Sequence, residues 1–210
     1  MKKLSVAIVI AIVCGAFFLS QCYENKTGET KNQKDTVLGG SKANGGYENQ
    51  VKWGEHLVTA IGCGDCHTPK KMGPMGPEED STLLLSGHPA KMPAPDVDRN
   101  AMESKGLFVS NDLTAWVGPW GISYSANLTS DETGIGTWNE DQFLFAIRNG
   151  KQKGLAGSRM LLPPMPWQSY RNLNDDELKA MFAYLKSTKP ISNMVPPPAA
   201  PVVQRKMQND

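Results

Sequence analysis

Apolar residues recur with a helical period in three separate stretches of this chain. The first stretch is residues 47–62, where Leu57, Val58 and Ile61 fall near helical spacing. Gly54 lies within the same stretch and lacks a side chain, so a second helix could approach closely there. We therefore expect a helix that ends just before a pair of cysteines.

The second and third helical stretches carry start signals. Residues 138–149 follow Thr137, which stands three positions before Glu140, the spacing of a capping box. The third stretch follows Asn174, with Glu177 three positions later, and then presents apolar residues on one side. The pattern thus predicts helices over 138–149 and from Asn174 onward.

Between His67 and Thr137 the helical pattern is absent. The segment is rich in proline and glycine, and "LFVS", "LTAW" and "ISYSANLT" hint at short extended pieces. About 70 residues without a strong helix are too many for an ordinary connection. We expect a long irregular insertion that wraps a large planar cofactor.

The N-terminus has the pattern of an export signal. Lys2 and Lys3 precede an apolar run from Leu4 to Leu19, which is shorter than the roughly 20 residues that cross a bilayer. The run ends in Leu-Ser-Gln-Cys at Cys22, which resembles a bacterial lipoprotein cleavage box. We expect lipid attachment at Cys22 on the periplasmic side of a membrane, with an uncleaved anchor or an ordinary cleaved signal as alternatives.

The rest of the chain divides by composition. We expect a leader over residues 1–21, a flexible polar tether over 22–46, one folded domain over 47–190 and a proline-rich extended tail over 191–210. The charged residues nearly balance, with 22 Lys and Arg against 21 Asp and Glu. No strong field can therefore recruit nucleic acid, and we expect no nucleic-acid partner.

The stretch "GCGDCHTPKK" places Cys63 and Cys66 three positions apart, with His67 directly after them. A zinc site needs about four ligands, but the exported part offers no further cysteine besides Cys22 and only His56 and His88 as other histidines. A catalytic dithiol usually opens a helix after a strand, whereas this pair follows a helical pattern. Both readings are therefore disfavoured.

Covalent haem explains the spacing. Two thiols separated by two residues can reach both vinyl groups of one porphyrin, and the next residue, His67, then lies beneath the iron as an axial ligand. Cys63 and Cys66 are thus predicted to attach one haem c. Export agrees with this prediction, because covalent haem attachment occurs outside the bacterial cytoplasm.

The other axial position decides between an electron carrier and an enzyme. Met165 is the first candidate, because prolines at 163, 164 and 166 stiffen the chain around it. Met160 is the second candidate. His88 offers bis-histidine ligation, although a structural or exposed histidine is the simpler interpretation.

Several motifs together resemble the single-haem c-type cytochromes, including cytochrome subunits that accompany bacterial alcohol or aldehyde dehydrogenases. They are "GCGDCHTPKKMGPMGPE", "LSGHP", "TAWVGPWGISYSANLTSDETGIGTWNEDQF", "AIRNGK" and "LLPPMPWQSYRNLNDDELKAMFAYLKS", within residues 53–190. The resemblance implies an all-α cytochrome c-like fold in which the first and last helices cross, and Met165 as the distal ligand. Such subunits often carry several haem motifs, whereas this chain has one, which favours a simple one-electron shuttle.

The function expected from these features is one-electron transfer between redox proteins, with a dehydrogenase or a terminal oxidase as possible partners, and no catalysis by the chain itself. A haem enzyme with an open sixth position that handles peroxide, and a haem-based gas sensor, are the alternatives. Basic residues flank the haem motif and the Met165 segment, where they could dock an acidic partner, balance haem propionates, or simply be solvated: Lys70, Lys71, Lys151, Lys153 and Arg159.

Overall fold

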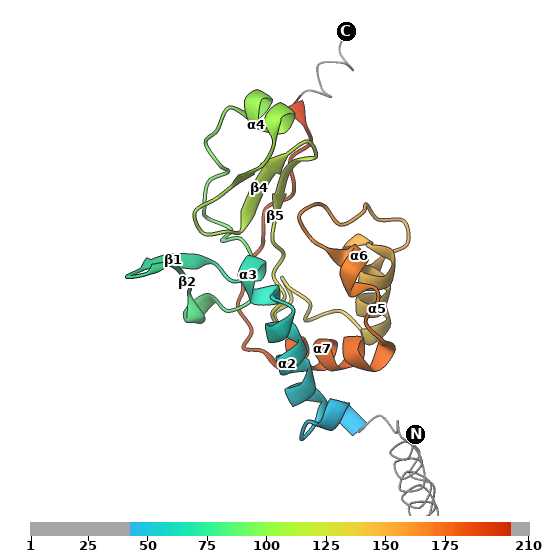
Figure 1. Cartoon of the computed structure of the whole chain (residues 1–210). Helices are drawn as coiled ribbons and strands as arrows, with labels where there is room; N and C mark the ends of the chain where they lie inside the picture. Colours follow the sequence, from blue (N-terminus) through green and yellow to red (C-terminus); the bar gives the residue numbers. More distant parts are fainter. Residues whose placement is uncertain (1–42, 203–210) are drawn as a thin grey trace, which may run out of the picture. The chain divides into compact units, whose positions relative to one another are not determined.

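The computed structural model describes residues 43–202, which form helices, two small sheets and long connections (Figure 1). The helices are α2 (Gln50–Ala60), α3 (Cys63–His67), α4 (Arg99–Lys105), α5 (Glu140–Asn149), α6 (Trp167–Tyr170) and α7 (Asp175–Ser187). The strands are β1 (Lys70–Gly73), β2 (Gly76–Glu79), β3 (Phe108–Val109), β4 (Ala115–Gly118) and β5 (Gly121–Tyr124). Single 3-10 turns lie at Ala43–Gly46, Ser81–Leu83 and Gln152–Gly154.

The expected all-α fold is wrong, because residues 70–124 contain two antiparallel sheets. β1 and β2 form a hairpin, and β3, β4 and β5 form a three-stranded sheet in that order. All four residues of β4 are buried, so the sheet has a packed interior of its own. The expected irregular insertion is therefore an ordered β region with one helix, because its short apolar pieces pair across tight turns instead of forming helical turns.

The three predicted helices are present. α2 begins after Asn49, whose side chain accepts a hydrogen bond from the Lys52 amide. α7 begins after Asn174 and has the predicted capping box with Glu177. α5 starts differently from the prediction.

Its capping box joins Asn139 and Gln142, two positions after the predicted pair of Thr137 and Glu140. Both pairs have the same spacing, and the backbone of Asn139 is the one that has the extended conformation of an N-cap. The predicted helix existed, and only its first residue was misplaced.

Helices α2 and α7 pack directly against each other. A Cβ atom at Gly54 would lie 1.9 Å from the Ala180 carbonyl oxygen, so only glycine lets the two backbones come this close. The packing of the first predicted helix on the last agrees with what the family resemblance implies. Around this contact lies the main core: Val58, Leu85, Ile135, Phe143, Ile147, Leu178, Met181, Phe182 and Leu185.

The chain after α7 runs back to the three-stranded sheet. Asn193 donates to the carbonyl oxygens of Ser86 and His88 through its side chain. Further on, Ala199 exchanges two backbone hydrogen bonds with Ile122 at the edge of β5. Asn193 and Ala199, which lie in the expected tail, are thus hydrogen-bonded to the folded part.

The predicted leader, Cys22 and most of the predicted tether fall outside residues 43–202. Within that range, no helix has the length and apolar character needed to cross a bilayer.

Candidate haem site

The two cysteines and the histidine of the motif lie on one short helix. Gly62 ends α2 in the left-handed conformation, with a φ of +74°, so the chain turns and α3 begins at Cys63. Side chains three and four positions apart lie on the same helical face. Cys63, Cys66 and His67 therefore share one face of α3 and can approach a single flat ligand together.

The two thiols are free and half-buried. Burial, with the nearby Cys66 and Asp65 charges, raises the pKa of Cys63 to about 12. Burial also raises the pKa of Cys66. A catalytic dithiol requires the opposite shift, because its nucleophile is the thiolate. The raised pKa values of Cys63 and Cys66 therefore disfavour thiol–disulfide chemistry.

His67 is buried and its ring is fixed by one hydrogen bond. The Nδ1 atom lies 2.7 Å from the carbonyl oxygen of Ala126. Since a carbonyl can only accept, Nδ1 carries the proton and Nε2 keeps its lone pair. Burial lowers the pKa of His67, which keeps the ring neutral. The same arrangement is typical of metal-ligating histidines, whose second nitrogen donates to a carbonyl or carboxylate.

Lys70 holds the end of the motif in place. Its Nζ atom donates to the carbonyl oxygens of Gly64 at 2.8 Å and Thr68 at 2.7 Å, and lies 3.5 Å from a Glu79 carboxylate oxygen. The Lys70 side chain is only 7% exposed, so it is not free to dock a partner. Lys71 is exposed and remains available for that predicted role.

The two candidate methionines have different surroundings. Met165 is half-buried and packs against the main core, as Cys63 also does. Met160 is 42% exposed, and its backbone forms an isolated bridge with Lys151. Of the two side chains, that of Met165 belongs to the same packed region as the motif.

The Met165 loop, residues 155–166, is tied to the helices on either side. Midway along it, the Leu161 amide donates to the carbonyl oxygen of Gly150, directly after α5, at 2.7 Å. After the loop, α6 places the Tyr170 hydroxyl 3.1 Å from the carbonyl oxygen of Ile61, directly before the motif. The helix that follows the loop is thus connected to the segment before Cys63 by a hydrogen bond between residues 109 positions apart.

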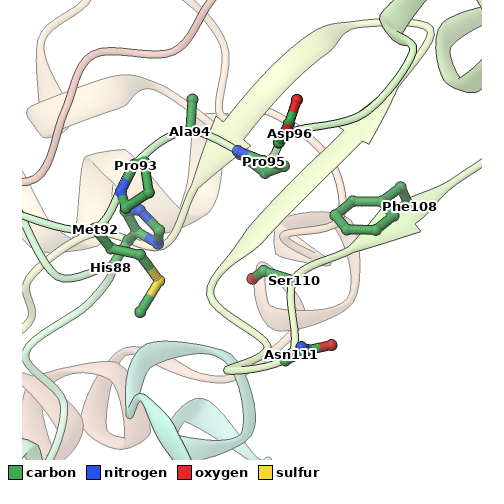
Figure 2. Close-up of a pocket in the computed structure, with 9 residues that line it drawn as sticks. All are labelled: His88, Met92, Pro93, Ala94, Pro95, Asp96, Phe108, Ser110 and Asn111. Carbon is green, nitrogen blue, oxygen red and sulfur yellow. The ribbon is translucent and has the colours of Figure 1, made fainter.

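His88 has partners of its own. Its Nδ1 lies 2.7 Å from the Thr114 hydroxyl, which donates to the Asp112 carboxylate, and its ring lies tilted against that of Tyr124, with 4.6 Å between the ring centroids. The side chain is 1% exposed and lies beside Met92 and Pro93 at the wall of a cavity of about 460 Å³. Figure 2 shows Phe108 and Ser110 on the opposite side of this cavity. His56, by contrast, is exposed and stacks on Tyr47.

Comparison with known proteins shows which proteins this chain is similar to. No family model matches the sequence. The fructose dehydrogenase cytochrome subunit of Gluconobacter japonicus is 35% identical over 147 residues, which are 69% of this chain and 23% of that protein. This chain is similar to the cytochrome c subunits of bacterial dehydrogenases.

Two further relatives are also named as cytochrome c subunits of dehydrogenases. The gluconate 2-dehydrogenase cytochrome c subunit of Pantoea cypripedii is 42% identical over 67 residues, or 31% of this chain and 14% of that protein. The cytochrome c subunit of the alcohol dehydrogenase (quinone) of Gluconobacter oxydans (strain 621H) is 28% identical over 157 residues, or 74% of this chain and 25% of that protein. The chain spans a quarter or less of the length of these three relatives.

The likeness confirms the resemblance to dehydrogenase-associated cytochrome c subunits that the motifs indicated. It is consistent with electron transfer and with a chain that is not itself catalytic. The number of haems and their ligands remain predictions.

The residues of this cytochrome-like chain fit a covalently bound haem. The motif offers two free thiols and a neutral imidazole with an unprotonated Nε2, and a thioether packs against the same core. Sequence reasoning missed the Ala126 carbonyl, and it named Lys70 only as a basic residue that could dock a partner or balance haem propionates. No sequence signal marks the first, because every residue has a carbonyl. Lys70 stands three positions after His67, but no sequence signal marks its burial.

Proposed function

We propose that this chain is a one-electron carrier with a single haem c, exported and tethered to a membrane. The observation that carries the proposal is the common face of Cys63, Cys66 and His67 on α3, together with the hydrogen bond that leaves Nε2 of His67 free to bind a metal. When bound, the haem supplies a metal centre that changes oxidation state by one electron. The chain's own residues would hold, orient and shield it.

Each residue would have a distinct task. Cys63 and Cys66 would form the thioether bonds, and His67 would bind the iron through Nε2. The Ala126 carbonyl would keep the imidazole in one orientation, and Lys70 would hold the motif backbone in place through its hydrogen bonds to two carbonyl oxygens. Rigid placement of these groups favours electron transfer, because little needs to move when the charge changes.

Met165 is our candidate for the sixth ligand. Its packing against the same core as Cys63 and the hydrogen bonds that restrain its loop support this assignment, whereas Met160 is exposed. A thioether favours reduced iron and raises the potential, as a carrier requires. A filled sixth position would also exclude peroxide and gases.

The ligand assignment can be tested with matched variants. We expect the purified ferric protein to be low-spin, to show the weak sulfur-to-iron charge-transfer band, and to bind carbon monoxide poorly when reduced. Met165→Ala should abolish the band and allow carbon monoxide to bind, while Met160→Ala should leave both unchanged. If Met160→Ala abolishes the band, the assignment is wrong. A high-spin wild type that rapidly turns over peroxide would favour the enzyme instead of the carrier.

Attachment of the haem is tested separately. Acid-acetone extraction should leave the haem on the denatured chain, with one haem per polypeptide. Cys63→Ala together with Cys66→Ala should release it. Free porphyrin in the wild-type extract would refute covalent attachment.

A dehydrogenase is the electron donor that the relatives' names favour, since each is named as the cytochrome subunit of one. We propose that the chain accepts electrons from such an enzyme and passes them to a second redox protein or a terminal oxidase. Stopped-flow reduction by a candidate dehydrogenase and its substrate would test this: slow, unsaturable reduction would argue against a specific pair.

Membrane attachment through Cys22 rests on the leader sequence. We expect mass spectrometry to find a diacylglyceryl group on Cys22 and no residue before it. An unmodified soluble form, or an intact Met1, would reject lipidation and leave the haem proposal untouched.

A further inference from the structure

The three-stranded sheet reaches the Met165 loop through one buried serine. Ser123 lies on β5 and is 5% exposed. Its hydroxyl lies 2.6 Å from the Pro163 carbonyl oxygen and 3.0 Å from Nε1 of Trp120. An indole N–H can only donate and a carbonyl can only accept. The direction of both hydrogen bonds is therefore fixed: the Trp120 indole donates to the Ser123 hydroxyl, which donates to the Pro163 carbonyl oxygen.

The turn between β4 and β5 positions the Trp120 indole for its hydrogen bond to Ser123. Gly118 pairs with Gly121 across the turn, and the Trp120 ring lies over Gly118 so closely that a Cβ there would be 2.6 Å from it. Gly121 has a φ of +93°, a conformation that other residues rarely adopt. The sequence Gly-Pro-Trp-Gly thus aims the indole N–H at Ser123 from a rigid turn.

The proline-rich end of the loop, residues 162–166, has few backbone hydrogen-bond donors. Pro163, Pro164 and Pro166 carry no backbone N–H. The Met165 amide donates within the loop, to the Leu162 carbonyl oxygen at 3.2 Å. The Pro163 carbonyl, two residues before Met165, accepts instead a hydrogen bond from Ser123 on β5.

We propose that Ser123 is a positioning residue for the sixth-ligand loop, and that the β3–β4–β5 sheet restrains the loop through it. This inference rests on the proposed ligation by Met165. Loss of the Ser123 hydroxyl leaves the Pro163 carbonyl without its donor and lets the loop open more often. A hydrogen bond of ordinary net strength shifts such an opening equilibrium by about two- to tenfold.

The chain offers a matched control. Ser125 is also buried, immediately follows β5, and donates its hydroxyl to the Thr114 carbonyl oxygen at 3.3 Å, away from the loop. Ser123→Ala and Ser125→Ala therefore remove the same atom from the same region. Only Ser123→Ala removes a hydrogen bond to the Met165 loop. Ser123→Thr keeps the hydroxyl.

Two measurements on the haem-loaded protein test the inference. The first is imidazole binding to the ferric form, which competes with the sixth ligand; Ser123→Ala should bind imidazole about two- to tenfold more tightly. The second is hydrogen exchange of the Leu161 and Met165 amides, which should accelerate by a similar factor. Ser125→Ala should change neither measurement, and Ser123→Thr should restore both.

The outcomes separate the two proposals. If the wild type shows the sulfur-to-iron band and Ser123→Ala behaves like Ser125→Ala, the positioning role is refuted and the ligand assignment stands. If the wild type lacks the band, the ligand assignment fails, and hydrogen exchange alone then decides whether Ser123 restrains the loop. Should Ser123→Ala fail to fold, Trp120→Phe removes the N–H that orients Ser123. Unchanged imidazole binding and unchanged loop exchange in Trp120→Phe would then overturn the inference.

Discussion

Substituting Gly54 by alanine tests the contact on which the helical part of the fold depends. The new Cβ atom would lie 1.9 Å from the Ala180 carbonyl oxygen, 2.5 Å from its carbonyl carbon and 2.9 Å from Cβ of Tyr184. Two of these three are backbone atoms, which cannot move aside as a flexible side chain can. Helices α2 and α7 would have to separate by about 1 Å or more to relieve the overlap.

The cost follows from two opposing effects. Overpacking a well-packed interface typically costs about 1–3 kcal/mol, and a gap of about 1 Å between packed surfaces forfeits up to half of the dispersion energy at each lost contact. Alanine is a better helix former than glycine by about 1 kcal/mol, which offsets part of the cost. With overpacking at the upper end of its range, we expect Gly54→Ala to lower the free energy of unfolding by about 2 kcal/mol.

Chemical and thermal unfolding measure this change. For a domain of this size, about 2 kcal/mol corresponds to a decrease of about 4–8 °C in Tm. Gly157→Ala is the control, because a Cβ there would meet no atom within 4 Å and the backbone has an ordinary φ. It should stay within about 0.5 kcal/mol of the wild type. If both variants unfold like the wild type, the two helices do not pack at Gly54.

Three further variants or titrations follow from the site. Lys70→Met should destabilise the protein by about 2–4 kcal/mol, because two partly buried carbonyls lose a charged donor, while Lys71→Met should change the unfolding free energy by less than about 0.5 kcal/mol; equal effects would refute the anchoring role. Tyr170→Phe removes the hydroxyl bound to the Ile61 carbonyl and should cost about 1 kcal/mol in denaturant unfolding; no loss of stability would count against this link. Burial lowers the pKa of His88 despite the nearby Asp112 charge, so the unfolded chain takes up this proton first as the pH falls. Stability should therefore decrease on acidification through pH 6.5, by at most about 1.4 kcal/mol per pH unit from this group, and NMR titration of the His88 ring should give a pKa below its usual range.

Local signals predicted the helices well. Asn174 and Glu177 mark the start of α7 by a spacing that needs no tertiary contact, and the structure has that capping box. The same rule misplaced the start of α5, because Thr137 with Glu140 and Asn139 with Gln142 have equal spacing. Choosing between them requires the backbone conformation, which depends on how the preceding loop packs.

The sheets were missed because their strands are short. β3 has two residues and β4 and β5 have four each, too few to establish an alternating pattern, and β4 is buried throughout. Their pairing depends on turns and on contacts with distant parts of the chain, including Ala199. A resemblance to an all-α family then led to the wrong fold class.

The sequence by itself determined which chemistry the chain can offer, because Cys63, Cys66 and His67 are neighbours and a single helical turn brings them onto one face. It also distinguished Met165 by the prolines around it, although its role remains a proposal. Only the tertiary structure decided what surrounds these groups: the Ala126 carbonyl that fixes the His67 ring is 59 residues away, and Ser123 is 40 residues from the Pro163 carbonyl that it binds. Backbone carbonyls are identical in every residue, so their partners follow from the path of the folded chain and cannot be read from side-chain patterns.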